Sequence, residues 1–294
     1  MTLHTVPDPV LRDLERIALG VASEAALLVG GRDSAQVCAT KSTPTDVVTE
    51  TDRRSQELIA HRLRALRPDD AFYAEEDGAL SGTSGLTWVV DPIDGTVNYV
   101  YDIPAYAVSV AAVVGNPRAP GQWAPVAGAV VNPVSGERFW ARTRGGAWRQ
   151  RGRLPATRLQ ASDRSELGLA LIGTGFGYAA NVRSWQARVL TPLLPQVRDI
   201  RRVGSAALDL CHVADASLDG FYERGLNPWD LAAGWVIVTE AGGTVCGLAE
   251  SDPSAAMTIA AGAVAPALRE ALVTIVDQVG PLDEATISSA EPGT

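Results

Sequence analysis

The sequence predicts an α/β fold of two fused lobes, with a mainly antiparallel N-terminal sheet and an α/β C-terminal lobe. Between residues 105 and 150, strand-like segments alternate with Pro, Gly and Asn turn signals, which is typical of an antiparallel meander. Beyond residue 165, strand-like and helix-like segments alternate, which favours an α/β lobe. The 294 residues approach the limit of roughly 250 to 300 for one continuous core. The polar stretch 149–165 carries five arginines and indicates a boundary or long connection, so we assign residues 1–155 to the first lobe and 156–294 to the second.

The first lobe is expected to open with an amphipathic helix. Residues 8–30 carry apolar side chains at a helical spacing, and a second helical pattern ends before Pro68. The segments AFYAEE (71–76) and TWVVD (87–91) then predict short strands.

The second lobe follows the alternation just described. Its expected strands lie in LALIGTG (169–175), VRDIRRVG (197–204), LDGFYE (218–223) and MTIAAG (257–262). Its expected helices span about 181–194, SAALDLCHVA (205–214), WDLAAGWVIVTEAGG (229–243) and about 264–278.

Composition excludes several classes of protein. The formal charge of -9 opposes nonspecific attraction to nucleic acid or anionic lipid. Three cysteines without a CxxC pair indicate reduced thiols. We find neither a signal-peptide pattern nor the roughly 20 mainly apolar residues of a membrane span, so we expect a cytoplasmic protein. The three histidines are far apart in sequence, so any metal must be held by oxygen.

The stretch DPIDGT, residues 91–96, carries the strongest chemical signal. Because proline has no N–H to donate to a sheet, we expect the preceding strand to stop at Asp91. Asp94 follows across a turn that Gly95 allows, so the two carboxylates can converge on one point. Converging anions repel, and a hard divalent cation relieves that repulsion. An ordinary acidic turn is the simpler alternative.

Neighbouring groups extend this site. The backbone carbonyl of Ile93 is an oxygen ligand of the kind that Mg²⁺ prefers. Thr96 stands at a possible helix start, where N–H groups and a hydroxyl can face an anion. Glu75 closes an expected strand and Asp230 opens an expected helix, so further carboxylates are available. Taken alone, Asp230 is more typical of a helix cap.

These motifs together resemble the inositol monophosphatase family of metal-dependent phosphatases, especially its bacterial inositol-1-monophosphatase members. The resemblance implies the layered fold of that family, with alternating layers of helix and sheet. The motifs that carry it are KSTPTDVVTETD (41–52), EE (75–76), DPIDGTVNYVYDIPAYAVSV (91–110), RRVGSAALDLC (201–211) and NPWDLAAGWVIVTEAGG (227–243).

The resemblance implies two or three Mg²⁺ ions and inhibition by lithium. A metal-bound water near Glu75 and Thr96 would attack phosphorus directly, without a phosphoenzyme. This suits the chemistry, because a metal lowers the pKa of bound water and stabilises the leaving alkoxide. The implied ligands are Glu75, Asp91, the carbonyl of Ile93, Asp94 and Asp230.

Two more catalytic residues are implied. Asp52 matches the acid that hydrogen-bonds the threonine corresponding to Thr96, although by itself it would be interpreted as the cap of a helix beginning near Arg53. Lys41 matches a lysine in a mobile loop that closes near the metals, although a lone lysine is usually a surface residue.

The substrate contacts follow from GSAA (204–207) and from Glu223. GSAA is similar to a helix start whose small residues leave room for a polyol, and Glu223 matches a carboxylate that binds inositol hydroxyls. An exposed charge at a strand end is the alternative for Glu223. In GTGFGY (173–178) the glycines are spaced GxGxG, so we reject dinucleotide binding and expect a loop at the site rim. The full set is Asp94, Gly95, Thr96, Gly204, Ser205, Ala206, Glu223 and Asp230.

The sequence therefore predicts a Mg²⁺-dependent phosphomonoesterase with myo-inositol 1-phosphate as leading substrate. Histidinol phosphate, fructose 1,6-bisphosphate and 3'-phosphoadenosine 5'-phosphate are rivals, the last disfavoured because no base-stacking site is evident. A noncatalytic partner of the transcription or ribosome-assembly machinery is the alternative from another class, and retention of every metal carboxylate argues against it. We expect a homodimer and a small phosphate ester as partners, without direct nucleic-acid or membrane binding.

Overall fold

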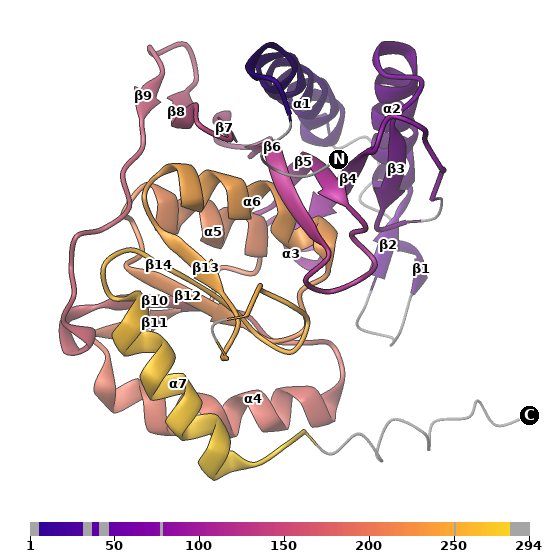
Figure 1. Ribbon diagram of the computed structural model, residues 1–294. Coiled ribbons are helices and arrows are strands. Elements are labelled where there is room, and N and C mark those ends of the chain that lie inside the picture. The colour runs from indigo at the N-terminus through magenta and orange to yellow at the C-terminus, as the bar shows by residue number, and fades with distance from the viewer. Residues whose placement is uncertain (1–5, 32–36, 41–46, 77–78, 250, 283–294) are drawn as a thin grey trace, which may run out of the picture.

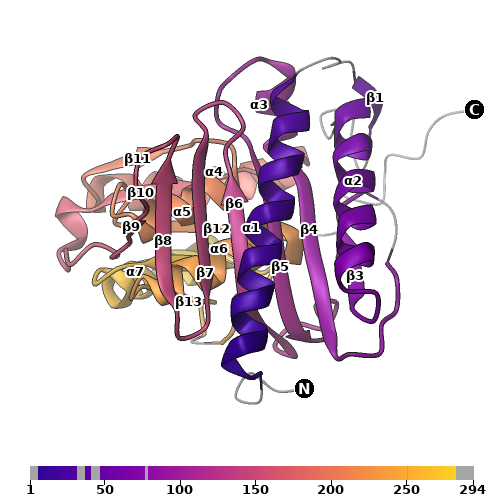
Figure 2. The ribbon, with the colours of Figure 1, turned by 90° about the horizontal axis from the view of Figure 1, so that it is seen from above.

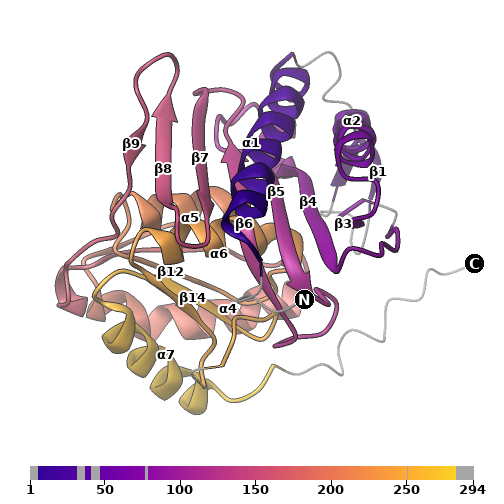
Figure 3. The ribbon, with the colours of Figure 1, turned by 45° about the horizontal axis from the view of Figure 1, so that its top comes forward.

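The chain folds into alternating layers of helix and sheet, which the computed structural model describes for residues 6–31, 37–40, 47–76, 79–249 and 251–282 (Figure 1). Two helices cover one face of a seven-stranded sheet, and two more separate it from a five-stranded sheet. A last pair of helices covers the outer face of the smaller sheet (Figure 3). The predicted α/β class and the mainly antiparallel first sheet are confirmed.

The outer layer consists of α1 (Asp8–Gly30) and α2 (Glu50–Leu66), which cross the large sheet side by side (Figure 2). The apolar stripe of α1 is buried against this sheet, as its helical periodicity predicts. Helix α2 begins at Glu50 rather than near Arg53. Its cap is Thr49, and Asp52 completes a capping box three residues later.

The large sheet is antiparallel except for its first pair of strands, which is parallel. Its strands, in spatial order, are β3 (Ala71–Ala74), β4 (Leu86–Asp94), β5 (Ala107–Gly115), β6 (Trp123–Val131), β7 (Glu137–Arg142), β8 (Gly146–Arg151) and β9 (Thr157–Arg158). Both faces are buried. Trp88 and Val90 contribute to the core under α1, whereas Val89 between them contributes to the core on the other face.

Strand β4 does not stop at Asp91, so that prediction is wrong. The strand continues through Pro92 to Asp94. Asp91 pairs with Ser109 and Asp94 pairs with Ala107, so β4 carries one more residue than its partner between the two pairs. A bulge of this kind tolerates proline, because the bulged segment leaves the ladder of backbone hydrogen bonds.

The central helical layer consists of α5 (Ala206–Ala214) and α6 (Pro228–Glu240). Both helices pack closely, because small residues lie at their contacts. A Cβ on Gly128 of β6 would lie 2.8 Å from Cα of Ala233, and one on Gly234 would lie 2.5 Å from Cβ of Leu210. Helix α6 therefore fits between α5 and the large sheet only with glycine at these two positions.

The smaller sheet is mixed, with β11–β10–β12 parallel and β12–β14–β13 antiparallel. All the strands and helices expected in the second lobe are present, and β13 is an additional strand. The bounds are β10 (Leu171–Thr174), β11 (Asp199–Arg201), β12 (Gly220–Glu223), β13 (Thr244–Cys246), β14 (Thr258–Ala261), α4 (Ala180–Leu193) and α7 (Ala265–Val279). The remaining elements are β1 (Val37–Thr40), β2 (Val47–Thr49), α3 (Thr96–Val100) and two 3₁₀ turns, Leu167–Leu169 and Leu194–Gln196.

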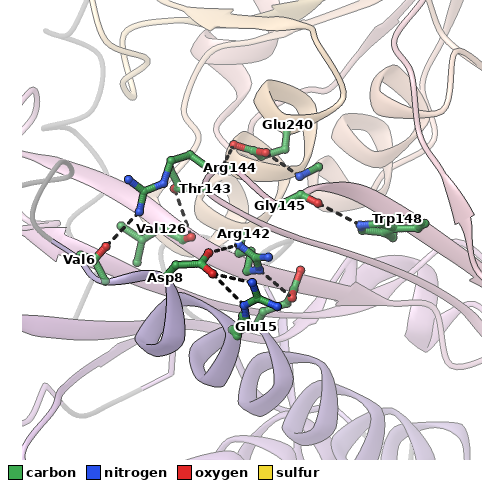
Figure 4. A network of polar contacts seen from close by, with 12 residues as sticks. Val6, Asp8, Glu15, Val126, Arg142, Thr143, Arg144, Gly145, Trp148 and Glu240 are labelled. Carbon is green, nitrogen blue, oxygen red and sulfur yellow. Dashed lines mark hydrogen bonds and ion pairs between the residues drawn. The ribbon is translucent and has the colours of Figure 1, made fainter.

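A polar network joins α1, the β7–β8 turn and the end of α6 (Figure 4). Arg142 forms ion pairs with Asp8 at 2.7 Å and with Glu15 at 3.3 Å. Glu240 accepts hydrogen bonds from the backbone N–H groups of Arg144 at 2.7 Å and Gly146 at 2.8 Å.

Within the described ranges, no helix is both long enough and apolar enough to cross a membrane.

Candidate active site

A pocket of about 460 Å³ lies where the end of β4 meets α5, α6 and β12. It brings together residues from both sheets and from the helical layer between them. Almost every predicted site residue lines it: Glu75, Asp91, Ile93, Asp94, Gly95, Thr96, Gly204, Ser205, Ala206, Glu223 and Asp230.

Three carboxylates in the lining of this pocket lie close together. Asp91, Asp94 and Asp230 each place an oxygen within 4.8 Å of the oxygens of the other two. Asp91 and Asp94 are three positions apart and would face opposite sides of a regular strand, but the extra residue of the β4 bulge turns both toward the pocket. This group of acids is the part of the described chain best suited to holding a metal ion.

Asp94 is held by the start of α5. Its Oδ2 accepts hydrogen bonds from the hydroxyl of Ser205 and from the backbone N–H of Ala207, the latter at 2.8 Å. Burial raises the pKa of Asp94 to about 6, and these hydrogen bonds oppose that rise.

Asp230 both helps to cap α6 and belongs to the group of three acids. Its Oδ2 accepts the backbone N–H of Asn227 at 2.8 Å, so Asp230 takes part in capping α6 as the third residue of a capping box, although the N-cap itself is Asn227. The side chain also belongs to the acid group. Burial raises the pKa of Asp230 well above its usual range, and the charges of Asp94 and Glu75 raise it further.

The turn after Asp91 is fixed by its own side chains. Oδ1 of Asp91 accepts the N–H of Ile93 at 3.0 Å. The hydroxyl of Thr96 lies 3.0 Å from the carbonyl of Ile93 and 3.3 Å from Oδ1 of Asp52. The expected contact between Thr96 and Asp52 is therefore present.

Gly95, directly after β4, and Gly204, shortly before α5, bring two segments of backbone close together. Both have a φ of 94°. A Cβ on Gly95 would lie 3.0 Å from the carbonyl oxygen of Gly204. Neither position accommodates a side chain without strain, because this φ is costly for L residues.

Glu223 ends β12 and faces the pocket rather than the outer surface. Burial raises its pKa to about 8, and the charge of Asp209 is the next cause. The interpretation of Glu223 as an exposed charge is wrong. Lys41 lies outside the residues that the structure describes.

Sequence reasoning missed several pocket residues, among them Asp209, Arg202 and Trp229. Asp209 follows Ser205 by four positions, so both side chains lie on one face of α5. That spacing was a usable signal. Arg202 acts on the pocket by its charge, which lowers the pKa of Asp94, Asp209 and Glu223.

Comparisons with known proteins agree with this geometry. The family model described as the inositol monophosphatase family matches residues 10–280. The Mycobacterium leprae protein named inositol-1-monophosphatase is 42% identical over 293 residues, which is 93% of this chain and 97% of the relative. The Pasteurella multocida protein named Nus factor SuhB is 38% identical over 217 residues, which is 73% of this chain and 76% of the relative.

A solved structure gives the same result for the fold. The structure of Mycobacterium tuberculosis SuhB superposes with a TM-score of 0.74 at 40% identity, covering 92% of this chain and 98% of that chain. The chain therefore belongs to the inositol monophosphatase family and is a phosphatase.

Proposed function

We propose that this phosphatase is a Mg²⁺-dependent phosphomonoesterase that hydrolyses a small polyol phosphate, with myo-inositol 1-phosphate as its first substrate. The observation that carries the proposal is the convergence of three carboxylates, with oxygens within 4.8 Å of one another, in the lining of one pocket. Such a group repels itself in the absence of a cation, and its oxygen ligands suit Mg²⁺.

The donor set fits a magnesium site. Asp91, Asp94 and Asp230 would hold the ions, with the Ile93 carbonyl and Glu75 of the same pocket as further ligands. Two or three ions are proposed because the family resemblance implies that number. When bound, Mg²⁺ would neutralise the phosphoryl oxygens and lower the pKa of water.

The residues around the acids would orient the attacking water. Asp52 accepts the hydroxyl of Thr96 at 3.3 Å and would thereby fix its direction. Thr96 would hold the water, and Glu75 would take its proton for in-line attack on phosphorus. Lys41 stays a proposed catalytic residue from the preceding segment.

The leaving group would lie at the α5 end of the pocket. Gly204, Ser205 and Ala206 leave the helix start uncrowded, and Glu223 faces the same space. A carboxyl group binds hydroxyls through hydrogen bonds, which favours a polyol. Histidinol phosphate and fructose 1,6-bisphosphate are the remaining substrate candidates.

A phosphate-release assay tests this proposal. The purified protein is incubated with inositol 1-phosphate, histidinol phosphate and fructose 1,6-bisphosphate, with Mg²⁺ and with a chelator. We expect Mg²⁺-dependent release that is fastest from inositol 1-phosphate and is inhibited by lithium. Asp91→Asn should lose at least about a hundredfold in kcat/KM, since removal of a metal ligand removes transition-state stabilisation.

The control is Asp199→Asn, because Asp199 is an exposed residue of β11 that pairs with Arg201. It should match the wild type. Release without Mg²⁺, or equal activity of Asp91→Asn, would refute the catalytic proposal. Faster release from another ester would refute only the substrate assignment.

A second candidate is a role in transcription, favoured by the similarity to the Pasteurella multocida protein named Nus factor SuhB. Surface plasmon resonance against RNA polymerase tests it. Asp91→Asn should bind as the wild type does, because Asp91 is buried.

We also propose a cytoplasmic homodimer by family resemblance. Analytical ultracentrifugation, which measures the mass of the particle in solution, tests the dimer.

A further inference from the structure

Two glycines of the GTGFGY motif make room for two acids. Gly173 lies in β10, and Gly175 is the first residue after this strand. A Cβ on Gly173 would lie 3.3 Å from Oδ1 of Asp209, and one on Gly175 would overlap the carboxyl group of Glu223. Positions two apart on an extended chain direct side chains to the same side. The motif therefore provides space for Asp209 and Glu223 on one side of β10.

Within the described part of the chain, Asp209 lacks a hydrogen-bond partner at one oxygen, where a buried carboxyl group normally has one. It is only 1% exposed, and its Oδ1 has no hydrogen-bond partner among the residues that the structure describes. Burying a carboxylate without partners is costly, so the group favours its neutral form. Burial is the main cause that raises the pKa of Asp209 to about 8. The negative charge of Asp94 adds to this rise, and the positive charge of Arg202 opposes it.

Two nearby acids show the contrast. Asp215, at the other end of α5, forms an ion pair with Arg149 at 2.5 Å. Asp219 accepts the hydroxyl of Ser162 at 2.5 Å and the N–H of Leu171 at 2.8 Å. These carboxylates have partners that explain their burial. Asp209 instead lines the pocket that also contains Glu223.

We propose that Asp209 is a positioning residue for Glu223, and that its buried carboxyl group helps Glu223 bind a hydroxyl of the leaving group. The proposal rests on the proposed polyol phosphatase function and adds the residue that sets leaving-group selectivity. A neutral carboxyl can donate a hydrogen bond, whereas two adjacent carboxylates would repel each other. Asp209 would thus keep Glu223 in place without a second negative charge.

The test compares two substrates. kcat/KM is measured with Mg²⁺ for inositol 1-phosphate and for ethyl phosphate, which has no hydroxyl on its leaving group. In Asp209→Ala, the ratio of the two values should fall at least about tenfold, because Glu223 is no longer held in place to bind the hydroxyl of the leaving group. The fall should come from KM for inositol 1-phosphate more than from kcat. Asp209→Asn, which is neutral and has a donor, should keep the ratio within about threefold.

The matched control is Asp215→Asn, a change of a buried acid on the same helix but outside the pocket. Its ratio should equal that of the wild type. If Asp209→Ala does not fold, Asp209→Leu takes its place, since it fills the space without a polar group.

Three results would overturn the proposal. The first is an unchanged ratio in Asp209→Ala, and the second is an equal fall in Asp215→Asn. The third is a fall in Asp209→Asn as large as that in Asp209→Ala. A wild type that hydrolyses neither ester would instead overturn the proposed function, and this proposal with it.

Discussion

The hydroxyl group of Ser205 donates a hydrogen bond to Oδ2 of Asp94, although the two residues are 111 positions apart in the chain. The same hydroxyl oxygen accepts the N–H of Leu208 at 3.3 Å, so Ser205 also caps α5. One small side chain therefore fixes a helix start and a carboxylate from β4 relative to each other.

Ser205→Ala is expected to reduce both activity and stability. Asp94 would lose one of its donors, and kcat/KM on inositol 1-phosphate should fall about tenfold because a charge-assisted hydrogen bond is lost. Loss of the cap should lower the free energy of unfolding by about 1 kcal/mol. Urea unfolding and phosphate release measure the two effects. Ser205→Thr keeps the hydroxyl and should stay close to the wild type; equal losses in Thr and Ala variants would contradict this explanation.

Magnesium is expected to stabilise the folded protein. At ten times the dissociation constant, a ligand that binds only the folded state adds about 1.4 kcal/mol, which should raise Tm. Asp94→Asn removes one of the three converging charges, so without Mg²⁺ its Tm should equal or exceed that of the wild type. With Mg²⁺ the order should reverse. Differential scanning calorimetry with and without a chelator measures this, and parallel gains in both proteins would exclude Asp94 as a ligand.

Gly175→Ala is expected to impair binding of the leaving group. The added Cβ would overlap the carboxyl of Glu223, which must move. KM for inositol 1-phosphate should rise about tenfold, since a displaced recognition group no longer makes its hydrogen bond. Gly168→Ala is the control, because the nearest atom to its Cβ would be 3.9 Å away. Equal KM values for the two variants would mean that Glu223 does not contact the substrate.

Glu240→Ala is expected to loosen the β7–β8 turn. The variant would leave the N–H groups of Arg144 and Gly146 without their acceptor (Figure 4). A hydrogen bond to a charged group contributes about 1.5–3 kcal/mol. Because this pair is partly exposed, the free energy of unfolding should fall by only about 1–3 kcal/mol in total. Chemical denaturation measures it. Glu270→Ala, at an exposed position of α7, should cost less than about 0.5 kcal/mol.

His212 should make stability depend on pH. Burial lowers the pKa of His212, while Asp215 and Glu137 oppose that shift. Below the ordinary value of about 6.5 the unfolded chain binds a proton that the folded chain resists. Stability should therefore fall as pH drops from 7.5 to 5.5, and His212→Gln should lose less. Urea titrations at three pH values provide the check, and identical slopes for the two proteins would show that His212 has no part.

Local patterns allowed much of this structure to be predicted. The stripe of α1 and the acids of DPIDGT lie in contiguous sequence, where periodicity and turn chemistry apply. The path of β4 through Pro92 could not be predicted, because a bulge depends on the partner strand. The burial of Asp209 could not be predicted either, because the groups around it come from β10 and β12.

The bulge in β4 also restricts how this protein can evolve. The odd spacing between Asp91 and Asp94 works only because one extra residue corrects the alternation of the strand. A one-residue insertion or deletion at this point would move one carboxylate to the α1 side of the sheet without altering the local composition. Length changes between the two aspartates should therefore be missing from active descendants of this chain, even where substitutions nearby are tolerated.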